Sequence, residues 1–305
     1  MSETGEPFAT IRPAGPFAFE PVLRYFARNA LEPVETVHGS AYLRAFFLDG
    51  EPAAVRVWWD DGALRVAAAG VTTARAAAVV TAMLQANRDS TPFEEMAARD
   101  PVLAPVAARS AGVRPPLPPD PFDTLVWAVL GQQISLPFAY RLKRRLAERY
   151  GRAVPSPWGA LRAFPTAGDL VTASPDELRA MQISGPKARY LIACSEAELA
   201  GAIPWQAARC APLDEAVAAL CSLQGVGRWT AEYVLLRGLG RWDAIPAGDA
   251  GLRHAIGTAY LGRRATEAEL REVVLAGKGW APYAGLAAFR WWLQPLLARP
   301  QSPPD

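Results

Sequence analysis

Leu223-Gln224-Gly225-Val226-Gly227-Arg228-Trp229-Thr230-Ala231 is the stretch that decides the fold of this chain. Its two glycines flank a valine, and glycine permits the positive φ angles and close backbone approaches of a tight turn. Apolar spacing on both sides predicts helices over 212–221 and 228–239, so residues from about 212 to 239 form a helix–hairpin–helix unit. The second helix would begin with free N–H groups, which bind phosphate without a charged side chain. A tight turn without a ligand is the alternative.

A carboxylate follows this unit. Asp249 comes directly after Pro246-Ala247-Gly248 and before an apolar-periodic helix expected over 249–261. Aspartate is a strong N-cap residue, stabilising a helix by ~1 kcal/mol, and this is the purely structural interpretation. A fixed carboxylate also stabilises the positive charge that develops on a sugar when a glycosidic bond breaks. The two roles are compatible, because a cap side chain lies at the end of its helix.

Composition indicates a soluble globular protein. The 305 residues are 51% hydrophobic and 20% charged, enough for two or three domains. No apolar run reaches the ~20 residues that span a bilayer, and the N-terminus has no signal-peptide pattern, so we expect a cytoplasmic protein without membrane contact. Cys194, Cys210 and Cys221 lack CxxC spacing, which argues against a disulfide framework, a zinc site or an iron–sulfur cluster.

Charge is distributed unevenly between the two parts of the chain. Residues 1–120 carry 11 Lys and Arg against 14 Asp and Glu, whereas residues 121–300 carry 21 against 15. The positive part is also the part that holds the hairpin and Asp249. This asymmetry weakly favours a polyanion-binding domain beside a domain that makes no such contact.

The predicted fold class is α+β, with an antiparallel-sheet domain followed by an all-helical domain. Residues 1–16 form an irregular lead-in, and periodicity predicts helices over 17–29 and 73–87 around strands at 34–37, 42–48, 52–59 and 63–69. The proline-rich segment 114–121 separates domain 1–113 from domain 122–305. The remaining helices are expected at 121–133, 135–150, 158–163, 166–172, 175–182, 185–200, 249–261, 266–275 and 281–297, in addition to the hairpin pair.

The order of motifs resembles the helix–hairpin–helix superfamily of DNA glycosylases, and within it the bacterial 3-methyladenine DNA glycosylase II branch. Asp249 follows Gly227 by 22 residues, as the superfamily pattern requires. The resemblance covers nearly the whole chain. Three further segments carry it: Gly131-Gln132-Gln133-Ile134-Ser135, Gly185-Pro186-Lys187-Ala188-Arg189 and Trp280-Ala281-Pro282-Tyr283 with Trp291-Trp292. It implies base excision repair of alkylation damage in double-stranded DNA, catalysed by a hydrolase that flips the damaged base out of the helix.

Trp229 decides between two mechanisms that the resemblance implies. Bifunctional members have a lysine at this position, which forms a Schiff base with the sugar. The only lysines here are Lys143, Lys187 and Lys278, so no amine nucleophile is expected at the site. The implied enzyme is a monofunctional N-glycosylase without lyase activity. Asp249 is the catalytic residue, which stabilises the cation and orients or deprotonates the attacking water.

The resemblance also implies a base pocket and a DNA-contacting surface. Trp229, Tyr233 and Trp292 are the candidates for aromatic pocket walls that stack on an electron-poor purine, although core packing is the alternative for each. Gln132 and Gln133 lie where the branch places a wedge that fills the space left by the flipped base. DNA contacts are expected at Gln132, Gln133, Gly225, Val226, Gly227 and Arg228.

Several alternatives stay open from the sequence. His254 lies one turn after Asp249, where a general base or a solvated histidine both fit. The basic run Arg141, Lys143, Arg144 and Arg145 fits phosphate contacts or a solvated helix face. No cofactor or metal is expected, with a monovalent cation at the hairpin left open, and the protein is expected to be a monomer. The rival functions are a glycosylase for deaminated or oxidised bases and a non-catalytic DNA-binding protein.

Overall fold

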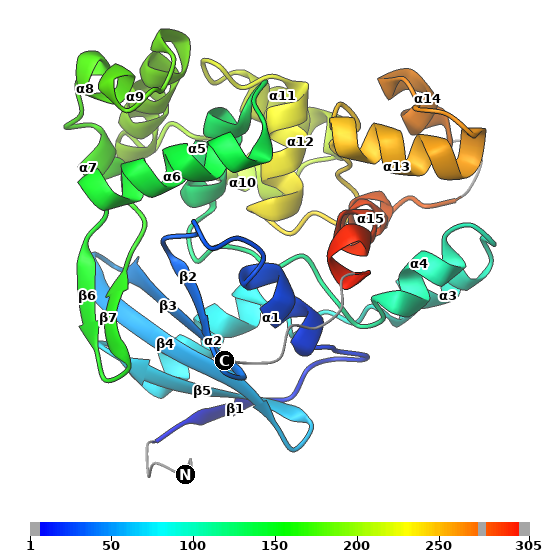
Figure 1. Ribbon diagram of the computed structural model, residues 1–305, viewed down its shortest axis with the longest axis horizontal. Helices are drawn as coiled ribbons and strands as arrows, with labels where there is room; N and C mark the ends of the chain where they lie inside the picture. The colour runs from blue at the N-terminus through cyan, green and yellow to red at the C-terminus, as the bar shows by residue number, and fades with distance from the viewer. Residues whose placement is uncertain (1–6, 274–278, 299–305) are drawn as a thin grey trace.

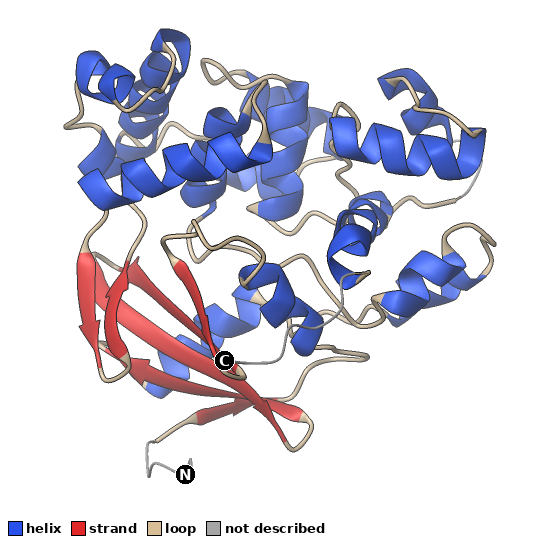
Figure 2. Ribbon diagram, in the orientation of Figure 1, coloured by secondary structure: helices blue, strands red, loops and turns tan. Residues whose placement is uncertain are grey.

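The computed structural model describes residues 7–273 and 279–298. An antiparallel sheet occupies one corner of the molecule, and helices fill the remainder (Figure 1). Figure 2 shows that the strands gather in this one region, with most helices above it and to its right. The predicted fold class, a sheet domain followed by a helical domain, is therefore confirmed.

Five antiparallel strands form the sheet, in the order β1-β5-β4-β3-β2. Tight turns at Asp49-Gly50 and Asp61-Gly62 join the central strands, where backbone φ angles are positive at both positions of each turn. The register pairs Tyr42 with Val57, and Val57 with Val66, so these buried side chains share one face. The strands are β1 Ala9–Ile11, β2 Glu35–His38, β3 Ala41–Leu48, β4 Glu51–Asp60 and β5 Ala63–Ala69.

Helices cover one face of the sheet, and a β-hairpin covers the other. On the first face, α1 (Glu20–Phe26) and α2 (Thr73–Met83) pack against the sheet, and the Phe26 ring stacks on Tyr42 with centroids 4.0 Å apart. On the second, β6 (Ala153–Ser156) and β7 (Gly159–Arg162) bring Val154 and Leu161 against the residues of β3 and β4. The helix predicted over 158–163 is therefore wrong, and so is the irregular lead-in at 9–11, which pairs with β5.

The helical part follows the remaining predictions closely. Three short helices, α3, α4 and α10, were not predicted. Residues 274–275, at the end of the helix expected over 266–275, lie outside the described residues. The helices are α3 Thr91–Ala98, α4 Ala104–Arg109, α5 Pro121–Gly131, α6 Leu136–Tyr150, α7 Ala167–Leu170, α8 Pro175–Ala180, α9 Gly185–Leu199, α10 Trp205–Cys210, α11 Leu213–Cys221, α12 Arg228–Arg237, α13 Ala250–Leu261, α14 Glu267–Arg271 and α15 Ala284–Leu297.

Among the described residues, each of the four hydrophobic cores includes residues from both sides of the proline-rich segment. Phe289 and Leu293 of α15 belong to the core under the sheet. Helices α3 and α4 pack against α13 and α15, and buried Arg290 donates to Glu94 at 2.7 Å. The division into domains at 114–121 stays a prediction. Among residues 7–273 and 279–298, no helix is long and apolar enough to cross a membrane.

Candidate active site

The hairpin between α11 and α12 is held by a close packing contact. Gly225 has φ of 82°, a left-handed conformation that favours glycine. A Cβ atom built there would lie 2.2 Å from Cγ of Tyr190, so the tyrosine ring occupies the space that any side chain would need. Val226 is buried, and its N–H donates to the Leu223 carbonyl at 3.1 Å. The sequence pattern thus folds as a helix–hairpin–helix unit, with Val226 fixing the turn from inside.

The N-terminus of α12 is open to an approaching ligand. Gly227 is the N-cap residue, and a Cβ there would meet nothing within 4 Å. Gly227 and Thr230 line a cleft of about 680 Å³. Partial positive charge at a helix N-terminus favours an anion at this place. Arg228 forms ion pairs with Asp214 and Glu232 at 3.3 and 2.9 Å, and its contact with DNA stays a prediction.

The loop between α5 and α6 is tied to the hairpin. Gln132 Nε2 donates to the Gly225 carbonyl at 2.9 Å and to Thr230 Oγ1 at 3.1 Å. Lys187 Nζ donates to the carbonyls of Leu130 and Gln132, each at 2.7 Å. Gln133 is exposed in the cleft with φ of 55°. The Gln132 side chain therefore braces the hairpin, while the Gln133 side chain projects from the same loop.

Asp249 is the N-cap of α13, as predicted. Its Oδ1 atom accepts from the Leu252 N–H at 2.8 Å and from Trp292 Nε1 at 3.2 Å. The turn before it is closed by a hydrogen bond from the Asp249 N–H to the Pro246 carbonyl at 2.9 Å. Oδ1 is thus held by two donors from different elements, which fixes the carboxylate in place.

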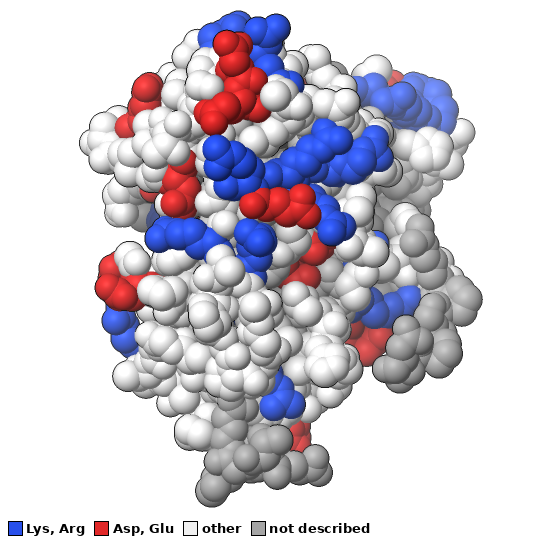
Figure 3. All heavy atoms as spheres, turned by 60° about the vertical axis from the view of Figure 1, so that its left-hand side comes forward, with Lys and Arg blue, Asp and Glu red and all other residues white. Residues whose placement is uncertain are grey.

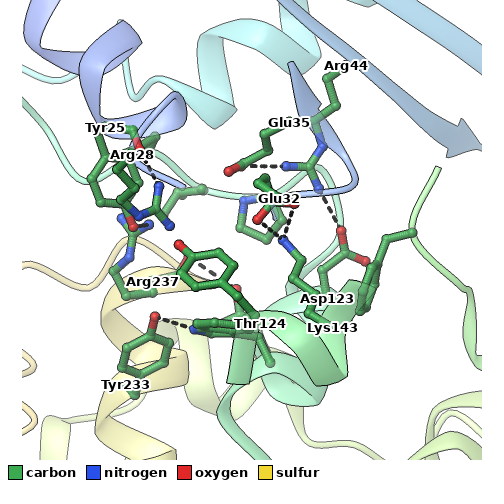
Figure 4. A pocket seen from close by; sticks show the side chains of 16 residues that line it. Tyr25, Arg28, Glu32, Glu35, Arg44, Asp123, Thr124, Lys143, Tyr233 and Arg237 are labelled. Atoms are coloured by element: carbon green, nitrogen blue, oxygen red, sulfur yellow. Dashed lines mark hydrogen bonds and ion pairs between the residues drawn. The ribbon is translucent and has the colours of Figure 1, made fainter. Parts of the chain in front are cut away.

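The three predicted pocket aromatics form one contiguous array. Ring centroids are 5.5 Å apart for Trp229 and Tyr233, and 5.9 Å apart for Tyr233 and Trp292. Together with Asp249 they line a cavity of about 410 Å³, within the usual range of ligand pockets. The Tyr233 hydroxyl accepts from Trp127 Nε1 at 2.9 Å, which orients its ring (Figure 4). Asp249 and Trp229 also line the cleft at the hairpin, so they lie where the two cavities meet.

Sequence reasoning missed eight of the residues that line this pocket, and two of them, Ala139 and Leu296, are ordinary apolar residues. Trp127 and Tyr140 come from helices α5 and α6, where they look like ordinary core residues. Leu136 is 58% exposed at the start of α6, and only that exposure distinguishes it. The other three, Tyr25, Arg28 and Arg237, have no motif, and two of them lie in the N-terminal part of the chain.

Other candidates lie away from the pocket. His254 is exposed and lines neither cavity. Of the basic run, Lys143 pairs with Glu32 at 2.7 Å and Arg144 with Glu148 at 2.8 Å. Figure 3 shows Lys and Arg side chains over the upper part of one face, with Asp and Glu side chains among them. Within residues 7–273 and 279–298, no group of three His, Cys, Asp or Glu side chains is placed to hold a metal ion.

Comparisons with known proteins agree with this geometry. The family model of the "HhH-GPD superfamily base excision DNA repair protein" matches residues 126–276, and that of the "AlkA N-terminal domain" matches residues 10–118. A DNA-3-methyladenine glycosylase of Bacillus subtilis is 33% identical over 207 residues, covering 67% of this chain and 68% of that protein. The chain belongs to the HhH-GPD superfamily of base excision DNA repair proteins.

Two further similarities extend this family assignment. The DNA-3-methyladenine glycosylase 2 of Escherichia coli is 31% identical over 182 residues, which are 60% of this chain and 61% of that protein. The solved 3-methyladenine DNA glycosylase of Archaeoglobus fulgidus superposes with a TM-score of 0.83 at 24% identity, covering 93% of this chain and 97% of that one. The latter shows that the fold is shared across both parts of the chain.

Proposed function

We propose that this protein is a monofunctional DNA glycosylase that hydrolyses the N-glycosidic bond of alkylated purines, such as 3-methyladenine and 7-methylguanine. The position of Asp249 carries the proposal. Its carboxylate lies where the aromatic pocket meets the cleft at the hairpin. The relatives named as DNA-3-methyladenine glycosylases support the choice of substrate.

In the proposed reaction, double-stranded DNA binds with its backbone at the hairpin and its damaged base in the aromatic pocket. Gly225 and Gly227 keep the hairpin free of side chains, so a phosphate can reach the N–H groups of α12. The flipped base stacks on Trp229, Tyr233 and Trp292, whose π faces attract an electron-poor or cationic ring. We propose that Gln133, in the α5–α6 loop, contacts the DNA double helix.

Bond cleavage then requires one water molecule. The C1′–N bond breaks, and its electron pair leaves with the base, which departs neutral if it was cationic. Asp249 stabilises the positive charge on the sugar, and the two donors to its Oδ1 keep the carboxylate pointing at that charge. Water adds to C1′ and gives up a proton, so the product is an abasic site.

The positions of the lysines favour hydrolysis over a Schiff-base mechanism. Trp229 occupies the lysine position of bifunctional members. Lys143 is paired with Glu32, and Lys187 is bound to two backbone carbonyls. Lys278 lies outside the described residues. We therefore propose that the DNA strand stays intact unless alkali is added.

The proposed reaction uses no resident cofactor, and we propose that the protein acts as a monomer in the cytoplasm. A monovalent cation held by hairpin carbonyls remains a prediction from the sequence. One of those carbonyls, that of Gly225, already accepts a hydrogen bond from Gln132 Nε2.

The test is a base-release assay on methylated duplex DNA with the Asp249→Asn variant. We expect release of methylated purines to be abolished while DNA binding persists, because asparagine keeps the size and an acceptor oxygen but not the charge. Abasic sites made by the wild-type protein should break only after alkali treatment. Full activity of Asp249→Asn would refute the proposed function, and strand breaks without alkali would refute the monofunctional mechanism.

A further inference from the structure

The inner end of the aromatic pocket is built partly by the N-terminal part of the chain. Tyr25, in α1, and Arg28, just after it, meet Tyr140 of α6 and Arg237 of α12. These four residues line both the aromatic pocket of about 410 Å³ and an adjoining cavity of about 60 Å³. The pocket therefore ends against polar groups, in contrast to the aromatic rings near its mouth.

Tyr25 holds two guanidinium groups at this inner end. Figure 4 shows Arg28 and Arg237 converging on Tyr25 from opposite sides of the interface. Arg28 donates to the Tyr25 carbonyl, and its Cζ lies 3.6 Å from the Tyr25 ring centroid. Arg237 Nη2 donates to the Tyr25 hydroxyl at 2.6 Å. Both cationic groups are thus fixed by hydrogen bonding and by cation–π attraction.

The carboxylates of the adjoining cavity are engaged by other cations. Glu32 accepts from Lys143 at 2.7 Å. Glu35 and Asp123 accept from Arg44 at 2.9 and 2.8 Å. Neither Arg28 nor Arg237 has a carboxylate within 4 Å among the described residues. The inner end of the pocket therefore presents positive charge and hydrogen-bond donors.

Two of these donors are buried without a partner in the described part of the chain: Arg237 Nη1 and the Tyr140 hydroxyl. Arg237 is 9% exposed and Tyr140 is 1% exposed. Burial raises the pKa of Tyr140, so its hydroxyl keeps the proton that it donates. An unpaired buried donor costs free energy, and a pocket that holds such donors favours a ligand that supplies an acceptor.

We propose that Arg28, Arg237 and Tyr140 contribute to specificity by donating hydrogen bonds to an acceptor on the flipped base, which raises the release of 6-oxopurines relative to that of 6-aminopurines. The proposal rests on the proposed function, because it places the base in the aromatic pocket. The ligand class that these donors favour is a purine with a carbonyl oxygen at position 6. An amino group at that position would leave Arg237 Nη1 unpaired, because a guanidinium has no acceptor, and it would leave the proton of the Tyr140 hydroxyl without an acceptor.

Methylated DNA provides a matched pair of probes. It contains 7-methylguanine, with a carbonyl at position 6, and 3-methyladenine, with an amino group there. Both nucleosides carry the same positive charge. They also differ in the position of the methyl group and in intrinsic bond lability, but these differences are the same for every variant, so the change in the ratio from wild type to variant reports on the pocket. Both bases are released in one reaction and separated by chromatography, which makes the ratio independent of enzyme concentration.

The variants are Arg28→Met, Tyr140→Phe and the control Arg99→Met. Arg28→Met should lower the ratio of 7-methylguanine to 3-methyladenine release by about 10- to 100-fold, the value of a hydrogen bond from a charged donor. Tyr140→Phe should lower it by about 3- to 10-fold without loss of thermal stability, because the hydroxyl that it removes has no partner in the described residues. Arg99 is exposed at the end of α3 and lines neither cavity, so Arg99→Met should leave the ratio unchanged.

Each outcome decides one claim. A lowered ratio in both pocket variants, with the control unchanged, supports the specificity role. An unchanged ratio in Tyr140→Phe and in Arg28→Met overturns it, even if overall rates fall. Release of neither base by the wild-type protein would overturn the proposed function itself, and the specificity role with it.

Discussion

Substitution by alanine should have different effects on stability at the two glycines of the hairpin. Gly225 has φ of 82°, and its Cβ would collide with the Tyr190 ring at 2.2 Å. Gly227 has φ of −89° and ψ of 174°, an extended conformation that any residue adopts, and its Cβ would meet nothing within 4 Å. Alanine should therefore damage the fold at Gly225 and leave it intact at Gly227.

The expected magnitudes follow from these geometries. A left-handed conformation costs a non-glycine residue ~1–2 kcal/mol, and forcing a methyl group into packed space costs ~1–3 kcal/mol. Gly225→Ala should thus lower the free energy of unfolding by about 2–5 kcal/mol. Gly227→Ala should cost less than ~1 kcal/mol, because alanine is only a weaker N-cap than glycine.

The two variants should also differ in their affinity for DNA. Gly227→Ala adds a methyl group where a phosphate would approach the N–H groups of α12, so the Kd for duplex DNA should rise about tenfold or more, equivalent to at least ~1.4 kcal/mol. Urea unfolding measures the stability, and fluorescence anisotropy with a duplex containing an uncleavable abasic analogue measures the Kd. Wild-type stability of Gly225→Ala, or wild-type affinity of Gly227→Ala, would refute this account of the hairpin.

Two further predictions concern the carboxylates. Trp292→Phe removes the Nε1–H donor to Asp249 and should lower kcat about 10-fold. The control Trp291→Phe removes an indole N–H that has no partner in the described residues, so it should leave kcat unchanged. Equal losses of the two variants in single-turnover assays would contradict this role of Trp292. Burial raises the pKa of Asp123 from 3.8 to about 7, against the favourable effect of Arg44. Because the folded-state pKa is raised, this carboxyl stabilises the fold at low pH and loses its contribution as the pH rises through about 7. Asp123→Asn should therefore make the free energy of unfolding, measured in urea, depend less on pH, by at most ~4 kcal/mol over the titration. Parallel plots of this free energy against pH for the wild type and the variant would count against the prediction.

The sequence predicted most of the fold because its strongest signals are local. Alternation and Asp-Gly turns located the central strands, and periodicity with caps located the long helices. The hairpin β6–β7 was missed because its strands have four residues each and are stabilised by packing of Val154 and Leu161 on the sheet. That contact joins segments far apart in the chain, which no local pattern reveals.

The same distinction applies to the candidate site. Asp249 and the aromatic residues were found because a motif fixes their spacing, and the structure brings them around one cavity. Arg28 and Arg237 were not found, because each is an ordinary charged residue until the fold brings both to Tyr25. The ion pair of Arg228 with Glu232, one helical turn away, was not predicted either, because the sequence drew attention only to the hairpin side of Arg228.

Helix α15 makes the stability of the pocket depend on that of the sheet. One side of this helix carries Trp292 beside Asp249, and Phe289 and Leu293 of the same helix are buried under the sheet. Loss of the N-terminal part would expose these side chains and release the helix that positions the tryptophan. A truncated chain that retains every motif residue should therefore be inactive. Heat inactivation and loss of the sheet's circular dichroism signal should occur in one cooperative transition.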